Sequence, residues 1–457
     1  MPNKDTNSQS DFMIERIKQR PINRRKLLRR TLITASMAVI FGLIACFTFL
    51  ILEPVISNWL YPEEEAEVQP VEFPEDQSEM SPEEMLAENL PAESPSPETD
   101  PTEESVTLDE EQIEGILNRV TLDKDSYSQM YQNLYNFIYD SEDVSGQTSI
   151  SQYMVTIRGI SSNIDWFNTV QESNSQTSGV IIADNGKEFL ILADYTSLKN
   201  ADSLVLELHD GFYQIEAKLK GYDPSTNLAV VAVDLNSIPI EWMEAGGLAV
   251  APMGSSGQRN LAGTPVIAVG SPMGISDSVG YGIITASGTF SATDRNYKLM
   301  LTSIEGSKKA SGALFNLKGE LIGIITNNKI SSDIGNMINV YGITELKKVV
   351  EKMSNENKLP YMGISGVDVP YTVHLNNNVP YGAYVTDIDM DSPAMQAGIQ
   401  QGDVITAVDD NVVTVFNEYS NILLQIEPGQ TVNLTVMRQV QTEYKEMNFS
   451  IVLEESR

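Results

Sequence analysis

Between residues 152 and 341 the chain alternates short β-branched runs with turn signals, and this pattern constrains its fold more than any other feature. Short strands separated by Gly, Asn-Gly and Asp-Pro are typical of all-β barrels and sandwiches, because each strand must pair with a neighbour. We therefore expect a mostly β fold here. The expected strands include residues 153–157, 179–183, 189–192, 203–208, 228–233, 264–269, 282–286 and 321–325.

The N-terminal part predicts a single transmembrane helix. Residues 1–30 are basic, whereas residues 31–52 carry no charge and are mostly apolar. At about 1.5 Å per residue, this stretch can cross a hydrocarbon core of about 30 Å. The basic flank places the N-terminus in the cytoplasm and the later domains outside the cell membrane. A cleaved signal peptide is the alternative, but the apolar run is long and 53–55 (Glu-Pro-Val) offers no cleavage site.

Charge and cysteine content exclude several partners. The net charge of −33 argues against nucleic acid, which is bound through cations that neutralise phosphate. The single cysteine, Cys46, lies in the apolar span, so no disulfide or cysteine-ligated metal is expected elsewhere. The only histidines, His209 and His374, are not at metal-binding spacing, and we expect no metal and no cofactor. His209 is expected at a hairpin end and His374 in a loop.

Two segments separate the predicted anchor from the β-rich part. Residues 53–106 are rich in Glu, Pro and Ser, which favours an extended, disordered acidic linker. Residues 107–142 then show helical spacing and predict a stalk of two short helices that packs on the next domain or on a copy of itself. Its periodic apolar residues are Tyr127, Met130, Leu134 and Ile138. A further amphipathic helix is expected over residues 344–353.

Four stretches resemble the HtrA family of trypsin-like serine proteases with a C-terminal PDZ domain. They are residues 179–186 (GVIIADNG), 223–233 (DPSTNLAVVAV), 270–286 (beginning GSPMGI) and 302–323 (ending NLKGELIG), in the family's order. The resemblance implies a chymotrypsin-like double β-barrel over residues 150–353, followed by a PDZ domain of α/β structure over residues 359–453. Trimers are common in this family, so a homo-oligomer is a possible state.

The residues at the family's catalytic positions do not form a triad. The histidine position falls on Tyr195 and the aspartate position on Asn227, while the nucleophile position falls on Ala310 without a gap or on Ser311 with a one-residue deletion. A general base must exchange a proton near neutral pH. A tyrosine has an ordinary pKa of about 10, so removing its proton at pH 7 costs about 4 kcal/mol.

The loop before the nucleophile position has also changed. Lys308 stands where the family has a glycine that lets backbone N–H groups turn toward the oxyanion. One alternative catalytic arrangement stays open, in which Ser311 pairs with Lys308 or Lys309 as a Ser-Lys dyad. Such a lysine would have to be buried, whereas two adjacent lysines beside Glu305 are more typical of a solvated loop.

The PDZ-like part keeps its binding motif. Tyr361-Met362-Gly363-Ile364 resembles the family's carboxylate-binding loop, in which backbone N–H groups capture a peptide C-terminus that adds to a sheet edge. The resemblance makes Tyr419 and Leu423, on a predicted helix over residues 416–426, candidates to line the groove. The alternative is a PDZ fold kept only as a structural cap.

Three functions remain open at this point. The first is an inactive HtrA-like pseudoprotease, anchored in the membrane, that binds unfolded chains or C-terminal peptides through the PDZ domain and the former substrate cleft. The second is an active HtrA-type endopeptidase in protein quality control with an unusual nucleophile. The third is a non-catalytic oligomeric scaffold.

Overall fold

The protein was analysed as a computed structural model. It describes residues 29, 32–48, 68–74, 76, 124–139, 148–164, 170–208, 213–240, 242, 247–258, 260–327, 335–441 and 443–456. These fall into two units, residues 1–66 and residues 67–457, which are described separately.

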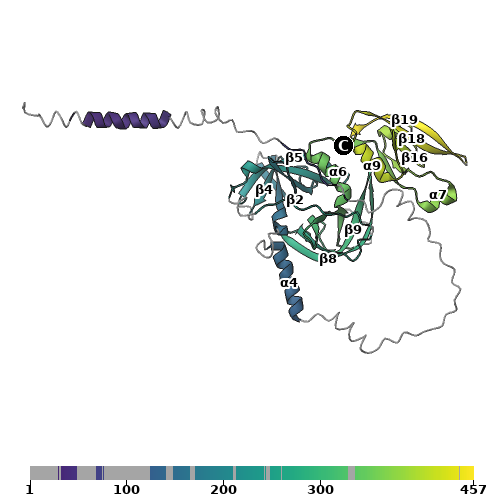
Figure 1. Ribbon diagram of the computed structural model, residues 1–457, viewed down its shortest axis with the longest axis horizontal. Helices are drawn as coiled ribbons and strands as arrows, with labels where there is room; N and C mark the ends of the chain where they lie inside the picture. The colour runs from purple at the N-terminus through teal and green to yellow at the C-terminus, as the bar shows by residue number, and fades with distance from the viewer. Residues whose placement is uncertain are drawn as a thin grey trace, which may run out of the picture. The chain divides into compact units, whose positions relative to one another are not determined.

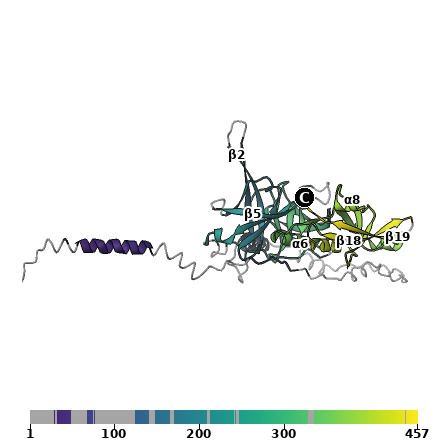
Figure 2. The same cartoon turned by 90° about the horizontal axis from the view of Figure 1, so that it is seen from above.

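The first barrel closes six antiparallel strands in the order β1-β2-β3-β6-β5-β4 (Figure 1). Its interior is filled by β-branched and leucine side chains such as Ile157, Ile191 and Val231, all fully buried. Figure 2 shows β2 extending beyond the rest of the barrel. The strands are β1 Met154–Ile164, β2 Val170–Asp184, β3 Glu188–Asp194, β4 Ser203–Leu208, β5 Tyr213–Asp223 and β6 Leu228–Asp234.

A second six-stranded barrel follows, with strand order β10-β11-β12-β9-β8-β7. Its longest hairpin joins β8 to β9 through a turn at Thr293 and Asp294. The mostly β fold and the double barrel are confirmed. The strands are β7 Pro265–Ser271, β8 Ser278–Ala292, β9 Arg295–Glu305, β10 Ser311–Asn316, β11 Leu321–Thr326 and β12 Met337–Gly342.

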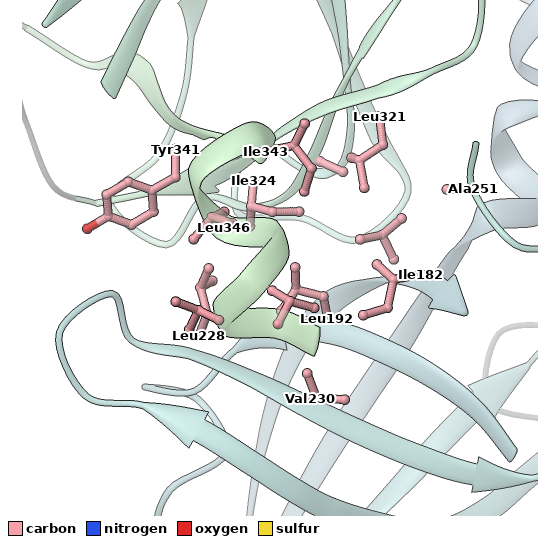
Figure 3. Close-up of a cluster of buried hydrophobic side chains, with 14 of the residues drawn as sticks. Ile182, Leu192, Leu228, Val230, Ala251, Leu321, Ile324, Tyr341, Ile343 and Leu346 are labelled. Atoms are coloured by element: carbon pink, nitrogen blue, oxygen red, sulfur yellow. The ribbon is translucent and has the colours of Figure 1, made fainter. Parts of the chain in front are cut away.

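Helix α6 (Ile343–Ser354) follows the second barrel and packs across both. Leu346, Val349 and Val350 form its buried face, as the 3.6-residue spacing predicts. In Figure 3, Leu346 and Ile343 lie among Ile182 and Leu192 of the first barrel and residues of the second. Side chains of both barrels and of α6 thus form one shared core, while each barrel also has an interior cluster of its own.

The C-terminal PDZ domain is built on a sheet with strand order β14-β15-β16-β18-β19, in which β17 pairs with β16. Helix α8 begins as expected, because the Ser392 side chain accepts a hydrogen bond from Met395 N and Pro393 occupies the first turn. The elements are β13 Pro360–Tyr361, β14 Ile364–Asp368, α7 Tyr371–Asn377, β15 Ala383–Ile388, α8 Pro393–Ala397, β16 Val404–Val408, β17 Asn411–Val412, α9 Phe416–Leu424, β18 Thr431–Val440, β19 Glu443–Val452 and β20 Glu454–Glu455.

Helix α4 (Lys124–Tyr139) lies within the predicted stalk. Ile138 is fully buried in the shared core, and Phe137 packs against the same cluster. Three tyrosines of the same helix are exposed (Tyr131, Tyr135, Tyr139). The other residues of the predicted 107–142 stalk lie outside the described part of the chain.

Part of the predicted acidic linker is packed and not extended into solvent. Val71 is buried, and its N–H donates to the Asn355 side chain (2.9 Å) at the end of α6. Asp76 pairs with Lys347 of the same helix. The expectation of disorder across 53–106 therefore needs correction at residues 68–74 and 76, where apolar and charged contacts with α6 offset the ordering entropy.

Residues 32–48, inside the predicted anchor, are helical and expose apolar side chains such as Leu32, Phe41 and Phe47. Within the described ranges, no helix has both the length and the apolar character needed to span a bilayer.

Candidate functional site

Ser311, at the start of β10, lies at the junction of the two barrels. Its Oγ accepts a hydrogen bond from the backbone N–H of Ser178 in β2 (3.1 Å). The Ser178 hydroxyl in turn lies 2.6 Å from the hydroxyl of Ser271 in β7. All three serines are buried. The Ser311 oxygen is thus an acceptor in a contact that joins β2, β7 and β10.

The segment before Ser311 does not supply a base. Ala310 is buried in the core of the second barrel, so the gap-free alignment leaves a methyl group at the nucleophile position. Lys308 and Lys309 are both exposed in the turn that Ala310 N closes onto Ser307 O (3.0 Å). This exposure contradicts the buried lysine that a Ser-Lys dyad requires.

Tyr195 and Asn227 lie side by side at the end of β3 and the start of β6. Tyr195 N donates to Asn227 O (2.8 Å), and Asn227 is exposed with a left-handed φ of 57°. The Tyr195 ring stacks on Tyr222, with centroids 4.3 Å apart. Burial and the neighbouring Tyr222 raise the pKa of the Tyr195 phenol above its ordinary value. The phenol is therefore even less suited to take a proton near pH 7.

The contacts found do not join these three positions into a triad. Within the described residues, the Ser311 hydroxyl bonds to Ser178, and the Tyr195 ring packs on Tyr222. His374 lies in helix α7 of the PDZ domain, which corrects the expected loop. Its Nδ1 is 2.7 Å from Val379 O, and its ring stacks on Tyr381. His209 lies outside the described residues.

A cavity of about 700 Å³ lies next to Ser178, among β1, β2, β4 and the β7–β8 turn. Its lining includes Met154, Trp242, Ile275 and the ion pair of Arg158 with Glu207 (2.5 Å). It combines apolar side chains with charged ones, which also include Asp277.

The predicted carboxylate loop of the PDZ domain is occupied by a carboxylate from the barrel. Asp294 Oδ2 accepts from Met362 N (2.7 Å) and Gly363 N (2.9 Å), and its Oδ1 accepts from Ile364 N (3.0 Å). The Tyr419 hydroxyl donates to the same Oδ1 (2.8 Å). Burial raises the pKa of the Asp294 carboxyl, and these four donors oppose that rise. They therefore offset part of the cost of desolvating the group.

The other predicted groove residues surround this contact. Tyr361 donates its hydroxyl to Asp389 (3.0 Å), and Gly363 has the positive φ (89°) that glycine tolerates. Leu423 is buried in the PDZ core beside Tyr419. All six predicted residues, Tyr361, Met362, Gly363, Ile364, Tyr419 and Leu423, thus belong to one region, and whether they bind an external peptide stays a prediction.

Comparisons with known proteins agree with this architecture. The model of the trypsin-like peptidase domain matches residues 177–324, and that of the PDZ domain matches residues 360–451. The serine endoprotease DegS of Haemophilus influenzae is 30% identical over 274 residues, which cover 58% of this chain and 74% of that protein. The chain belongs to the HtrA family.

Other HtrA relatives match over a similar length. A probable periplasmic serine endoprotease DegP-like of Halomonas elongata is 29% identical over 276 residues, which span 59% of this chain and only 55% of that protein. The solved structure of the HtrA-type protease AlgW with a decapeptide covers 67% of this chain and 96% of its own, at 21% identity and a TM-score of 0.46.

Sequence reasoning about this HtrA chain missed Asp294. The residue precedes Gly363 by 69 positions and sits between two strands, where an aspartate is typical of a turn. Its left-handed φ of 63° fits a turn equally well. Its second role, as the carboxylate that the PDZ loop binds, is visible only in the packing of the PDZ domain on the barrel.

Proposed function

We propose that this HtrA-family chain is a membrane-anchored, proteolytically inactive protein that binds unfolded chains or C-terminal peptides through its PDZ domain outside the membrane. The observation that carries the proposal is the loop of Met362, Gly363 and Ile364, whose three N–H groups converge on one carboxylate. A peptide C-terminus is the external ligand that presents the same chemical group.

The contacts of the substituted positions support the proposed loss of proteolysis. A hydrolase needs a base within hydrogen-bond reach of its nucleophile and donors for the oxyanion. Here the Ser311 hydroxyl accepts from Ser178 N, and Tyr195 is stacked on Tyr222. The cavity beside Ser178 would then serve as a cleft for unfolded segments without cutting them.

The membrane part of the proposal rests on residues 31–52. Their described portion, 32–48, is helical with apolar side chains exposed, and the flanking charge is basic before it and acidic after it. The positive-inside rule supports a cytoplasmic N-terminus.

An experiment on the full chain in detergent tests the loss of activity. Unfolded casein and an organophosphonate probe are added, with trypsin as a positive control for both reagents. We expect neither turnover nor labelling, and the same result for Ser311→Ala. Labelling that is present in the native chain and lost in Ser311→Ala would instead establish an active HtrA endopeptidase, the function that the names of the relatives favour.

Binding is tested with an array of immobilised decapeptides that carry either a free or an amidated C-terminus. Peptide binding through the loop predicts that amidation abolishes the signal, because the loop reads a carboxylate. A second candidate, a non-catalytic oligomeric scaffold such as a trimer, is favoured by the exposed tyrosines of α4. It predicts no peptide signal and self-association that is lost in Tyr131→Ser/Tyr135→Ser.

A further inference from the structure

The turn between β8 and β9 enters the PDZ groove in the manner of a bound peptide. Besides its carboxylate contacts, Asp294 donates its backbone N–H to Ile364 O (2.6 Å), and its carbonyl accepts from the Ser420 hydroxyl on α9 (2.8 Å). One residue thus fills the carboxylate loop and pairs with the start of β14. Both contacts are those that a peptide terminus makes when it adds to a PDZ sheet edge.

Neighbouring residues hold the turn in place. Thr293 donates its hydroxyl to Asp389 (3.0 Å), the same carboxylate that Tyr361 contacts. On the other side, Asn296 Nδ2 donates to Gly366 O (3.0 Å). The contact therefore extends along the turn on both sides of Asp294.

The surroundings of the Asp294 carboxylate favour its lasting burial in the PDZ loop. Asp294 is only 1% exposed, so its carboxylate has left water. Arg295, next in the chain, is also buried and lies 3.8 Å from Asp223. Burial lowers its pKa, whereas Tyr297, Asp223 and Asp294 raise it. The positive charge of this buried guanidinium offsets part of the cost of burying the two carboxylates.

We infer that the β8–β9 turn is a built-in ligand of the PDZ domain, with the Asp294 carboxylate standing in for a peptide C-terminus. This inference rests on the proposed function in one respect, namely that an external carboxyl terminus uses the same N–H groups and must displace Asp294 to bind. Because the turn belongs to the same chain, its effective concentration at the groove is high. An external peptide therefore binds only the undocked fraction, and its apparent Kd rises accordingly.

The first measurement needs no external ligand. In the full chain, hydrogen exchange at the amides of Met362, Gly363 and Ile364 is compared between the native protein and Asp294→Gly. Glycine suits the positive φ, so the turn itself is not strained. Asp277→Gly is the matched control, because Asp277 is an exposed aspartate with φ 59° in another turn of the same barrel.

We expect exchange at these three amides to accelerate at least about tenfold in Asp294→Gly and to stay unchanged in Asp277→Gly. Asp294→Asn keeps one acceptor oxygen and tolerates the same φ, so it should fall between the two. Unchanged protection in Asp294→Gly would overturn the inference.

The second measurement uses a pool of fluorescent decapeptides that end in Val, Leu, Ile or Phe with a free carboxyl group. If about nine-tenths of the native protein is docked, Asp294→Gly lowers the apparent Kd about tenfold, because the apparent Kd varies inversely with the open fraction. The amidated pool serves as the control. Equal, measurable affinity of the native protein and Asp294→Gly would contradict competition and overturn the inference.

The two measurements separate the two proposals. If Asp294→Gly deprotects the loop amides but no variant binds any peptide, the turn is the ligand of the loop and external peptide binding fails. If peptides bind the native chain while exchange does not respond to Asp294→Gly, the proposed function stands and the built-in ligand does not.

Discussion

The Ser311 hydroxyl has a structural task that differs from that of a nucleophile. It accepts the hydrogen bond of a buried N–H group, that of Ser178, at the seam between two barrels. A nucleophilic serine must instead offer its proton to a base. At the position where the family has its nucleophile, the serine side chain thus connects β10 to β2 by a hydrogen bond.

Replacing Ser311 by alanine should destabilise the protein. The Ser178 N–H would lose its partner inside the protein, at a cost of about 1–3 kcal/mol in the free energy of unfolding. Urea denaturation of the full chain measures this difference. Ser291→Ala, on an exposed position of β8, is the control and should change stability by less than about 0.5 kcal/mol. A Ser311→Ala variant as stable as the control would refute the structural role.

At the scale of elements, helix α6 organises more of the molecule than its length suggests. It contributes Leu346 (Figure 3) and Val350 to the shared core, and its polar side contacts residues 68–74 and 76. Burial raises the pKa of the Asp76 carboxyl, but hydrogen bonds from Lys347, Thr344 and Ser255, with the Lys347 charge, outweigh it and hold the pKa below its ordinary value.

This lowered pKa predicts that the contact of residues 68–74 and 76 with α6 depends on pH. A carboxyl whose folded pKa is depressed stabilises the contact above its unfolded pKa of about 4, and the stabilisation is lost as the pH falls through the folded pKa. Hydrogen exchange at the Val71 amide should therefore lose protection below about pH 4, after correction for intrinsic rates. Asp76→Asn should remove this dependence, and constant protection down to about pH 2 in the native chain would contradict the assignment.

Elements with local signals could be predicted, and contacts between distant elements could not. The apolar spacing of α6 and the β-branched runs of the barrels are visible in the sequence because each depends on periodicity. Residues 68–74 and 76, the described part of an acidic, proline-rich stretch, contribute Val71 and Phe73 to the shared core, so composition predicted disorder. Asp294 looked like a turn residue because its partners lie 68 to 126 positions away.

At the catalytic positions, too, the sequence predicts the local features and not the tertiary contacts. Their substitution is readable from the family motifs, since Tyr195 and Asn227 stand at fixed offsets from strands that resemble those of the family. The alignment left Ala310 and Ser311 undecided, because it cannot show which side chain faces the barrel junction. The structure places the Ala310 methyl in the core of the second barrel and the Ser311 hydroxyl on Ser178.

At the scale of the whole molecule, the proposed orientation across the membrane predicts a labelling pattern. Cys46 is the only cysteine, so Cys46→Ala gives a background in which single cysteines report their side of the membrane. In intact cells an impermeant maleimide should label Asp410→Cys, on an exposed turn of the PDZ domain, and not Ser8→Cys. Permeabilised cells, in which both must react, provide the control, and labelling of Ser8→Cys in intact cells would reverse the topology.

The seating of Asp294 in the PDZ loop also bears on biosynthesis. Ribosomes make the β8–β9 turn before the PDZ domain, and domains fold largely in the order of their synthesis. By the time residues 361–364 emerge, the aspartate that fits them is already present on the preceding barrel. A newly made molecule would thus complete its groove around its own side chain, and its first encounter with the termini of other proteins would come only after that.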